Sequence, residues 1–256
     1  MVRSREVLSE ELAGCRCLPY FDGTKVQQYI NYKLCYWGLT WEEAITYVNI
    51  GLDQEYYTWV TPVKSPQKLT VLVNKYRQLP EDYIPNDLEV IAPECNSSSL
   101  MLRYPAKVAF EEMCSAAGRE GLELKAISTF RSFLYQNQVY YKNWTGEITM
   151  EQYQKERDRV SARAGYSEHQ TGLAVDINDL EQTFEETPEG RWLAQNSWKY
   201  GFILRYPKGK EHITGYDYEP WHFRYIGPVL ACVVYKSGLT YDEYYVRYLA
   251  PAQCRN

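Results

Sequence analysis

Histidine is rare in this chain, and two of the three histidines lie among other residues that can do chemistry. His169 belongs to the stretch Ser167-Glu-His-Gln-Thr-Gly-Leu-Ala-Val-Asp-Ile. In it, Asp176 falls inside an apolar segment expected to be a strand, where a carboxylate is costly unless a cation or hydrogen bonds compensate it. An arginine partner or a surface-facing strand would account for Asp176, and so would a metal ion shared with His169, because imidazole and carboxylate both suit zinc.

The other histidine of interest, His222, lies in Tyr218-Glu-Pro-Trp-His-Phe-Arg-Tyr-Ile-Gly. Pro220 excludes a helix interior and favours extended backbone for Glu219. Residues three apart on a regular strand face opposite sides, so Glu219 and His222 would not both contact one metal ion. We therefore expect His222 as a ligand and Glu219, at an irregular strand entry, as a group that reaches only the metal-bound water. A hydrogen-bonded core histidine is the alternative for His222, and His212, in a charged stretch, is interpreted as a solvated loop residue.

Two imidazoles and one carboxylate would hold zinc by three protein groups and leave a fourth position to water. That arrangement is typical of catalytic rather than structural zinc sites. Such an ion lowers the pKa of its water towards about 7 and polarises a carbonyl. Glu219 would then take the proton of that water and pass it to a leaving amine.

The two stretches resemble the signatures of D-alanyl-D-alanine carboxypeptidases of the vancomycin-resistance (VanY) type, in a group that also holds lysostaphin-like enzymes and the hedgehog fold. The matching patterns are Ser-x-His-x-x-Gly-x-Ala-x-Asp at 167–176 and Glu-Pro-Trp-His-x-Arg at 219–224. The stretch Ser128-Thr-Phe-Arg-Ser-Phe-Leu-Tyr-Gln resembles the family's Tyr-Arg-Ser-x-x-x-Gln segment. The likeness runs from about residue 70 to residue 235.

The resemblance implies a zinc metallopeptidase that removes the C-terminal D-alanine of peptidoglycan stem peptides, or of a precursor ending in D-Ala, by attack of a zinc-activated water. Its ligands, for one zinc ion per chain, would be His169, Asp176 and His222, and its general base Glu219. Three alternatives stay open: L,D-carboxypeptidase action, D-Ala-D-Ala dipeptidase action, and a non-catalytic zinc-bearing module that binds the cell wall. Retention of Glu219 argues against the last, since a binding module needs no base.

The resemblance also assigns residues to the substrate. Arg131 would either grip the terminal carboxylate or stabilise the oxyanion, and both uses suit a guanidinium. Ser167 would hydrogen-bond the peptide, although a serine before a loop histidine also shapes turns. Gln136 would bind substrate or support the region around Arg131.

The elements expected to position these residues are short and unevenly interleaved, which favours an α+β fold with a small antiparallel sheet flanked by helices. Strands are expected at Leu69–Asn74, 122–129, 173–178, 202–206 and 218–226. Helices are expected at 105–118, 132–144, 149–163, 187–200, 228–236 and 240–249.

The N-terminal part of the chain has a helical pattern over residues 22–58. Thr40 followed by Glu43 is typical of a capping box and predicts a helix that begins there. We therefore expect an N-terminal helical extension at 1–60 and a zinc D,D-carboxypeptidase domain at 61–256.

Composition excludes several classes of protein. A net charge of −5 without a long block of like charges argues against nucleic-acid binding. Seven cysteines without a Cys-x-x-Cys pair indicate independent thiols. The first 20 residues lack the continuous apolar stretch of a signal peptide or a transmembrane segment, so the chain as written is expected in the cytoplasm, whereas the family commonly acts at the cell envelope.

Overall fold

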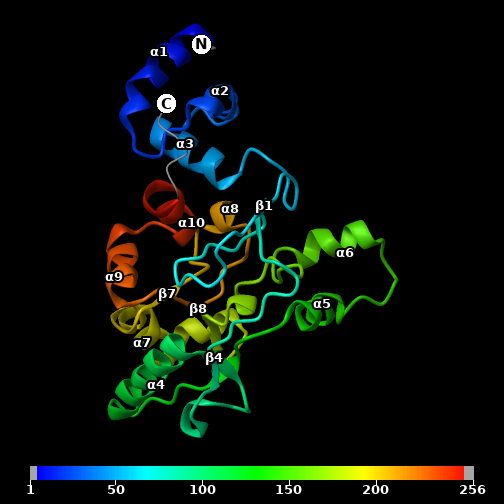
Figure 1. The fold of residues 1–256 in the computed structure, drawn as a ribbon, viewed down its shortest axis with the longest axis vertical. Coiled ribbons are helices and arrows are strands. Elements are labelled where there is room, and N and C mark those ends of the chain that lie inside the picture. The colour runs from blue at the N-terminus through cyan, green and yellow to red at the C-terminus, as the bar shows by residue number, and fades with distance from the viewer. Residues whose placement is uncertain (1–4, 251–256) are drawn as a thin grey trace. The chain divides into compact units, whose positions relative to one another are not determined.

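The computed structural model describes residues 5–250, which divide into two compact units. The first unit comprises residues 5–59 with 241–250, and the second is Val60–Thr240 (Figure 1). Residues 241–250 thus belong to the same unit as the N-terminal helices. The predicted functions of the segments before and after residue 60 remain predictions. Within residues 5–250, no helix is both long and apolar enough to span a bilayer.

The first unit is helical. Its helices are α1 (Arg5–Ala13), α2 (Val26–Cys35), α3 (Trp41–Ile50) and α10 (Tyr241–Tyr244), with the 3-10 turns η1 (Gly14–Cys17) and η2 (Gly23–Lys25) and the π-helical turn η7 (Tyr245–Leu249). The predicted capping box begins α3: Thr40 Oγ1 accepts from the Glu43 backbone N–H at 3.2 Å, and the Glu43 carboxylate accepts from the Thr40 N–H at 2.7 Å. The helix ends at Gly51, whose φ of 115° is left-handed and favours glycine.

The second unit is α+β, as predicted. Its strands are β1 (Thr61–Pro62), β2 (Arg77–Gln78), β3 (Leu88–Val90), β4 (Met101–Arg103), β5 (Ala126–Ser128), β6 (Ala174–Ile177), β7 (Phe202–Leu204) and β8 (His222–Tyr225). Its α-helices are α4 (Tyr104–Arg119), α5 (Phe133–Tyr141), α6 (Met150–Arg157), α7 (Pro188–Asn196), α8 (Glu211–Thr214) and α9 (Pro228–Ser237). Its 3-10 turns are η3 (Pro93–Cys95), η4 (Glu168–Thr171), η5 (Gln182–Glu186) and η6 (Ser197–Tyr200).

An antiparallel sheet in the order β5-β6-β8-β7 forms the centre of this unit. Every residue of β6 and β8 is buried, because both strands are interior to the sheet and are covered by packed chain. Phe110 of α4 packs edge-on against Phe202 of β7, with ring centroids 6.2 Å apart. Helices α5 and α6 extend away from the sheet (Figure 1). The smaller pairings are β3 with β4, antiparallel, and the two-residue β1 with β2, parallel.

Two expected strands differ from the structure. Leu69–Asn74 is not a strand: Asn74 forms only an isolated bridge, and the apolar residues there are buried in the core without strand pairing. The strand expected from 218 begins only at His222, because a turn precedes it in which the His222 N–H donates to the Glu219 carbonyl at 3.2 Å.

Candidate active site

The register of the central sheet sets two polar side chains against each other. Asp176 on β6 is the direct pairing partner of His222 on β8, although 46 residues separate them in the chain. Their side chains meet with Asp176 Oδ1 2.9 Å from His222 Nδ1. Directly opposed residues on neighbouring antiparallel strands have close Cβ atoms, so this contact follows from the pairing itself.

A tight loop brings the second histidine to the same place. Ser167 caps the turn η4, its hydroxyl accepting from the His169 N–H at 3.3 Å. The turn ends at Gly172, whose φ of 67° is left-handed and whose missing side chain leaves room for Arg103 and Leu88, each 2.9 Å from where a Cβ would stand. Glycine is therefore required between η4 and β6, and it lets the chain fold His169 back over the strand.

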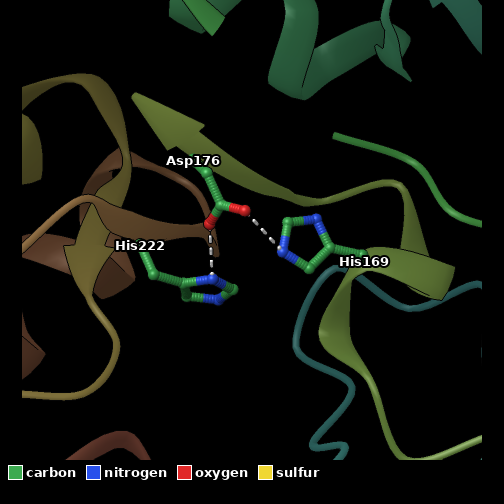
Figure 2. Close-up of side chains that lie close together, drawn as sticks. All are labelled: His169, Asp176 and His222. Atoms are coloured by element: carbon green, nitrogen blue, oxygen red, sulfur yellow. Dashed lines mark hydrogen bonds and ion pairs between the residues drawn. The ribbon is translucent and has the colours of Figure 1, made fainter. Parts of the chain in front are cut away.

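The His169 ring is held in one orientation by a backbone carbonyl. Its Nδ1 lies 2.6 Å from the Thr129 carbonyl oxygen, which can only accept, so Nδ1 carries the proton. The opposite nitrogen, Nε2, is then left with its lone pair and lies 3.2 Å from Asp176 Oδ2. Figure 2 shows both rings converging on the one carboxylate.

The three side chains fit a zinc ion. One ligand atom from each of His169, Asp176 and His222 lies within 4.8 Å of the others, and all three residues are buried. Burial lowers the pKa of His169 to about 4, so its ring is neutral at pH 7 and presents a lone pair. Burial would raise the pKa of Asp176, but the two histidines hold that pKa well below its usual range, so the carboxylate is ionised. A buried anion between two imidazoles is the donor set that zinc prefers.

Glu219 lies beside this cluster. Its Oε2 is 3.8 Å from His222 Nδ1, and its carboxyl group is buried. Burial raises the pKa of Glu219 to about 8. For His222, burial alone would lower the pKa, but the carboxylates of Asp176 and Glu168 outweigh it and raise the pKa to about 9. In the absence of a metal ion, both groups therefore hold protons at pH 7.

A cleft of about 340 Å³ opens over the cluster and contains Arg131. The backbone N–H of Arg131 donates to the His169 carbonyl at 3.2 Å, which ties the two segments together. Its side-chain Nε is buried and makes no hydrogen bond to any part of residues 5–250. Burial lowers the pKa of this guanidinium. A buried, unpaired donor in a cleft is a place for an anionic group of a ligand.

The two other predicted substrate residues, Ser167 and Gln136, differ in their position relative to the cleft. Ser167 lines the cleft. Gln136 does not line it: this fully buried side chain donates from Nε2 to the carbonyl of Ala162, at 2.6 Å, and Ala162 in turn lines the cleft. Gln136 therefore supports the cleft wall from behind.

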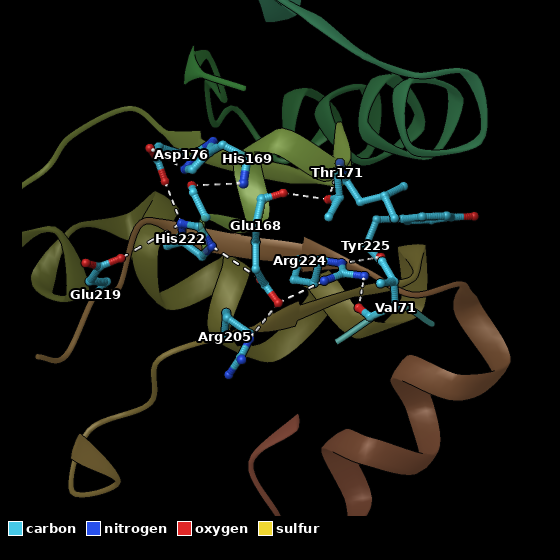
Figure 3. A network of polar contacts seen from close by, with 12 residues as sticks. Val71, Glu168, His169, Thr171, Asp176, Arg205, Glu219, His222, Arg224 and Tyr225 are labelled. Carbon is cyan, nitrogen blue, oxygen red and sulfur yellow. Dashed lines mark hydrogen bonds and ion pairs between the residues drawn. The ribbon is translucent and has the colours of Figure 1, made fainter. Parts of the chain in front are cut away.

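A buried charge network lies beneath the cluster and was not predicted from the sequence (Figure 3). Glu168 Oε1 accepts from Arg205 Nε and from Arg224 Nη1, both at 2.8 Å. Glu168 is next to His169 in the first motif, and Arg224 is two residues after His222 in the second. These positions were the signal in the sequence that could have drawn attention to both residues. Neighbouring charges far apart in the chain cannot be paired from sequence alone.

Comparison with known proteins identifies a matching family and several similar proteins. Residues 99–228 match the VanY family model, described as D-alanyl-D-alanine carboxypeptidase. YodJ of Bacillus subtilis (strain 168) is 39% identical over 211 residues, which cover 76% of each chain. A D-alanyl-D-alanine carboxypeptidase of Enterococcus faecalis (strain ATCC 700802 / V583) is 35% identical over 182 residues, covering 68% of this chain and 64% of the relative.

Solved structures resemble the chain as well. The LdcB LD-carboxypeptidase superposes with a TM-score of 0.67 at 38% identity, covering 74% of this chain and 91% of that one. VanYB in complex with D-alanine-D-alanine superposes with a TM-score of 0.59 at 32% identity, covering 68% of this chain and 96% of that one. A variant of the D,D-pentapeptidase VanY in complex with Zn(II) superposes with a TM-score of 0.58 at 32% identity, covering 68% of this chain and 97% of that one.

Proposed function

The chain belongs to the VanY family of D-alanyl-D-alanine carboxypeptidases, and on that premise we propose a role for each residue of its cleft. It is a zinc-dependent hydrolase. The observation that carries the assignment of roles is the convergence of His169, Asp176 and His222 at the floor of a cleft that also holds Glu219 and Arg131.

His169, Asp176 and His222 hold the zinc ion. When bound, the ion supplies Lewis-acid chemistry, acidifying water and polarising a carbonyl. The protein keeps His169 neutral and Asp176 ionised, and once His222 has given up its proton the ligands would offer one negative charge and two imidazole lone pairs to a dication.

Glu219 is the general base. Its carboxylate takes a proton from water as the water oxygen adds to the carbonyl carbon of the scissile peptide bond. When the carbon–nitrogen bond breaks, the same carboxyl group returns that proton to the leaving amine of D-alanine. Burial raises the pKa of Glu219 to about 8 in the metal-free protein, and a zinc ion held beside it would lower that pKa and favour the carboxylate that accepts the proton.

Arg131 binds the C-terminal carboxylate of the peptide. Its buried, unpaired Nε supports this role, since a guanidinium and a carboxylate form short, charge-assisted hydrogen bonds. An anchored terminal carboxylate would set the last peptide bond over the catalytic groups and make the enzyme a carboxypeptidase. Ser167, which lines the cleft, hydrogen-bonds the peptide backbone.

The substrate is a peptidoglycan stem peptide that ends in D-Ala-D-Ala. The likeness to VanYB in complex with D-alanine-D-alanine supports this choice. The test is digestion of a defined muramyl pentapeptide by the zinc-loaded chain, followed by mass spectrometry. Loss of one alanine is expected, and an intact pentapeptide would contradict the proposal.

L,D-carboxypeptidase action is a second candidate, favoured by the likeness to the LdcB LD-carboxypeptidase. The same digest separates the two, with a muramyl tetrapeptide and free D-Ala-D-Ala offered in parallel. Release of alanine from the tetrapeptide but not from the pentapeptide would replace the D,D-assignment by the L,D one. Cleavage of the free dipeptide alone would indicate a dipeptidase.

A further inference from the structure

Glu168 is a completely buried carboxylate to which the reaction above gives no role. It stands between Ser167 and His169 in the turn η4 and is 1% exposed. One oxygen, Oε1, is fully occupied: Arg205 Nε and Arg224 Nη1 each donate to it at 2.8 Å. Arg224 is fixed in turn, because its Nη2 donates to the carbonyl oxygens of Leu69 and Val71 at 2.9 and 2.7 Å. The carboxylate is therefore held rigidly.

The second oxygen of Glu168 points at the metal cluster. Oε2 is buried and lies 3.6 Å from His222 Nε2, which is also buried, and neither atom makes a hydrogen bond within residues 5–250. Figure 3 shows the two side chains facing each other, joined by a dashed line. Buried polar atoms without partners are rare and costly in folded proteins. Because these two atoms face each other, a small movement of the His222 ring would bring them into hydrogen-bond distance.

The two histidines differ in which nitrogen faces the aspartate. His169 turns Nε2 towards Asp176 and has its Nδ1–H on the Thr129 carbonyl. His222 turns Nδ1 towards Asp176 and Nε2 towards Glu168. A neutral imidazole carries one proton, so a ring that offers Nδ1 to a cation must keep its proton on Nε2. A carboxylate at Nε2 is the group that enforces this tautomer.

We propose that Glu168 is a positioning residue for the zinc site, in which its Oε2 accepts the Nε2–H of His222 and holds that ring with Nδ1 towards the metal. The inference rests on the proposed function, because it presupposes zinc bound by His169, Asp176 and His222. Arg205 and Arg224 hold the carboxylate so that its second oxygen meets the ring. The two histidines of the site thus bind through opposite nitrogens, one set by a backbone carbonyl and the other by a buried carboxylate.

The first experiment measures zinc affinity by chelator competition in the wild type and in Glu168→Gln, which keeps the side-chain size and removes the anion. We expect affinity to fall about 10- to 100-fold, with a changed visible spectrum of the Co²⁺-substituted protein. Asp158→Asn is the matched control: it removes another buried carboxylate, which pairs with Arg163 at 2.8 Å and does not line the cleft, and it leaves Glu168 against His222. Its thermal stability should fall while zinc affinity stays within about threefold of wild type, because its loss leaves the contact to the ring in place.

Several outcomes would overturn the proposal. Unchanged zinc affinity and an unchanged Co²⁺ spectrum in Glu168→Gln would do so, and so would an equal loss of affinity in Asp158→Asn, which would make the role of Glu168 purely structural. Failure of the wild type to bind zinc would remove the proposed function and this inference with it. Absence of peptidase activity in a wild type that binds zinc would leave this inference standing.

A second measurement needs no variant and so survives a variant that fails to fold. The chain has only three histidines, so ¹⁵N-histidine NMR of the zinc-loaded protein gives few signals. His222 should show the Nε2–H tautomer and His169 the Nδ1–H tautomer. A proton on Nδ1 of His222 would contradict the proposal.

Discussion

Asp176 and His222 are paired across the β6–β8 ladder, with Oδ1 2.9 Å from Nδ1. The sheet therefore positions two of the three proposed zinc ligands, and only His169 comes from a loop. Ligands held by paired strands are more precisely placed than ligands on free loops. Because the site is rigid, single substitutions around it should report the contribution of each residue to zinc binding or to turnover.

Replacing Glu219 should separate chemistry from metal binding. Glu219→Gln should retain zinc and lower kcat by about 10²- to 10⁴-fold, because the amide cannot take the proton of water. Metal content and turnover of a pentapeptide are measured on the same sample. Glu186→Gln, an exposed glutamate of η5, is the control and should leave both unchanged. Loss of zinc from Glu219→Gln would show that Glu219 is a ligand.

Removing a proposed zinc ligand should abolish both zinc binding and turnover. His222→Ala should lose zinc and turnover together, because two side chains cannot hold the ion in place of three. His212→Ala is the matched control, since His212 is an exposed histidine of α8 outside the cleft. It should keep the full metal content by elemental analysis. Zinc bound one to one in His222→Ala would refute the ligand assignment.

The two uses of Arg131 make different predictions for peptides with and without a terminal carboxylate. If it binds the carboxylate, Arg131→Ala should lower kcat/KM about 10²- to 10³-fold on the free acid. The same variant should act like wild type on the poorly cleaved C-terminal amide, which has no anion to bind. An equal loss on acid and amide would point to oxyanion stabilisation. Arg119→Ala, an exposed arginine at the end of α4, controls for loss of charge.

Zinc affinity should increase with pH. In the metal-free protein the pKa of His222 is raised to about 9, so its ring is protonated at pH 7, and zinc binding must expel that proton. Apparent affinity should therefore rise about tenfold per pH unit between pH 8 and 9 and level off above. Below pH 8 the rise should steepen towards about a hundredfold per pH unit, because Glu219, with its pKa raised to about 8, loses a second proton when zinc binds. Chelator competition across this range checks the slope, and an affinity independent of pH would contradict it.

Gln136 should matter for stability. Gln136→Ala leaves the buried Ala162 carbonyl without its donor and should cost about 1–3 kcal/mol of unfolding free energy in denaturant titration. Gln138→Ala, exposed on the same helix, should cost little. A KM that rises strongly in Gln136→Ala without loss of stability would favour direct substrate binding, as the resemblance first implied.

Much of the fold was predictable because its signals are local. The capping box at Thr40 and Glu43 and the helix over Tyr104–Arg119 depend on residues within a few turns of one another. The strand expected at Leu69–Asn74 was wrong for a tertiary reason. Its apolar residues are buried by packing in the core, and its carbonyls at Leu69 and Val71 are used by Arg224 instead of a neighbouring strand.

From the amino-acid sequence alone came the family to which the motifs belong, the side chains proposed to bind zinc and the carboxyl group proposed as base. Residue type and short spacing carry that information. The folded chain was needed to establish which nitrogen of each imidazole faces Asp176 and which oxygen of Glu168 faces His222. Those choices depend on the pairing of strands 46 residues apart and on two arginines from distant segments, and no local pattern encodes such a register.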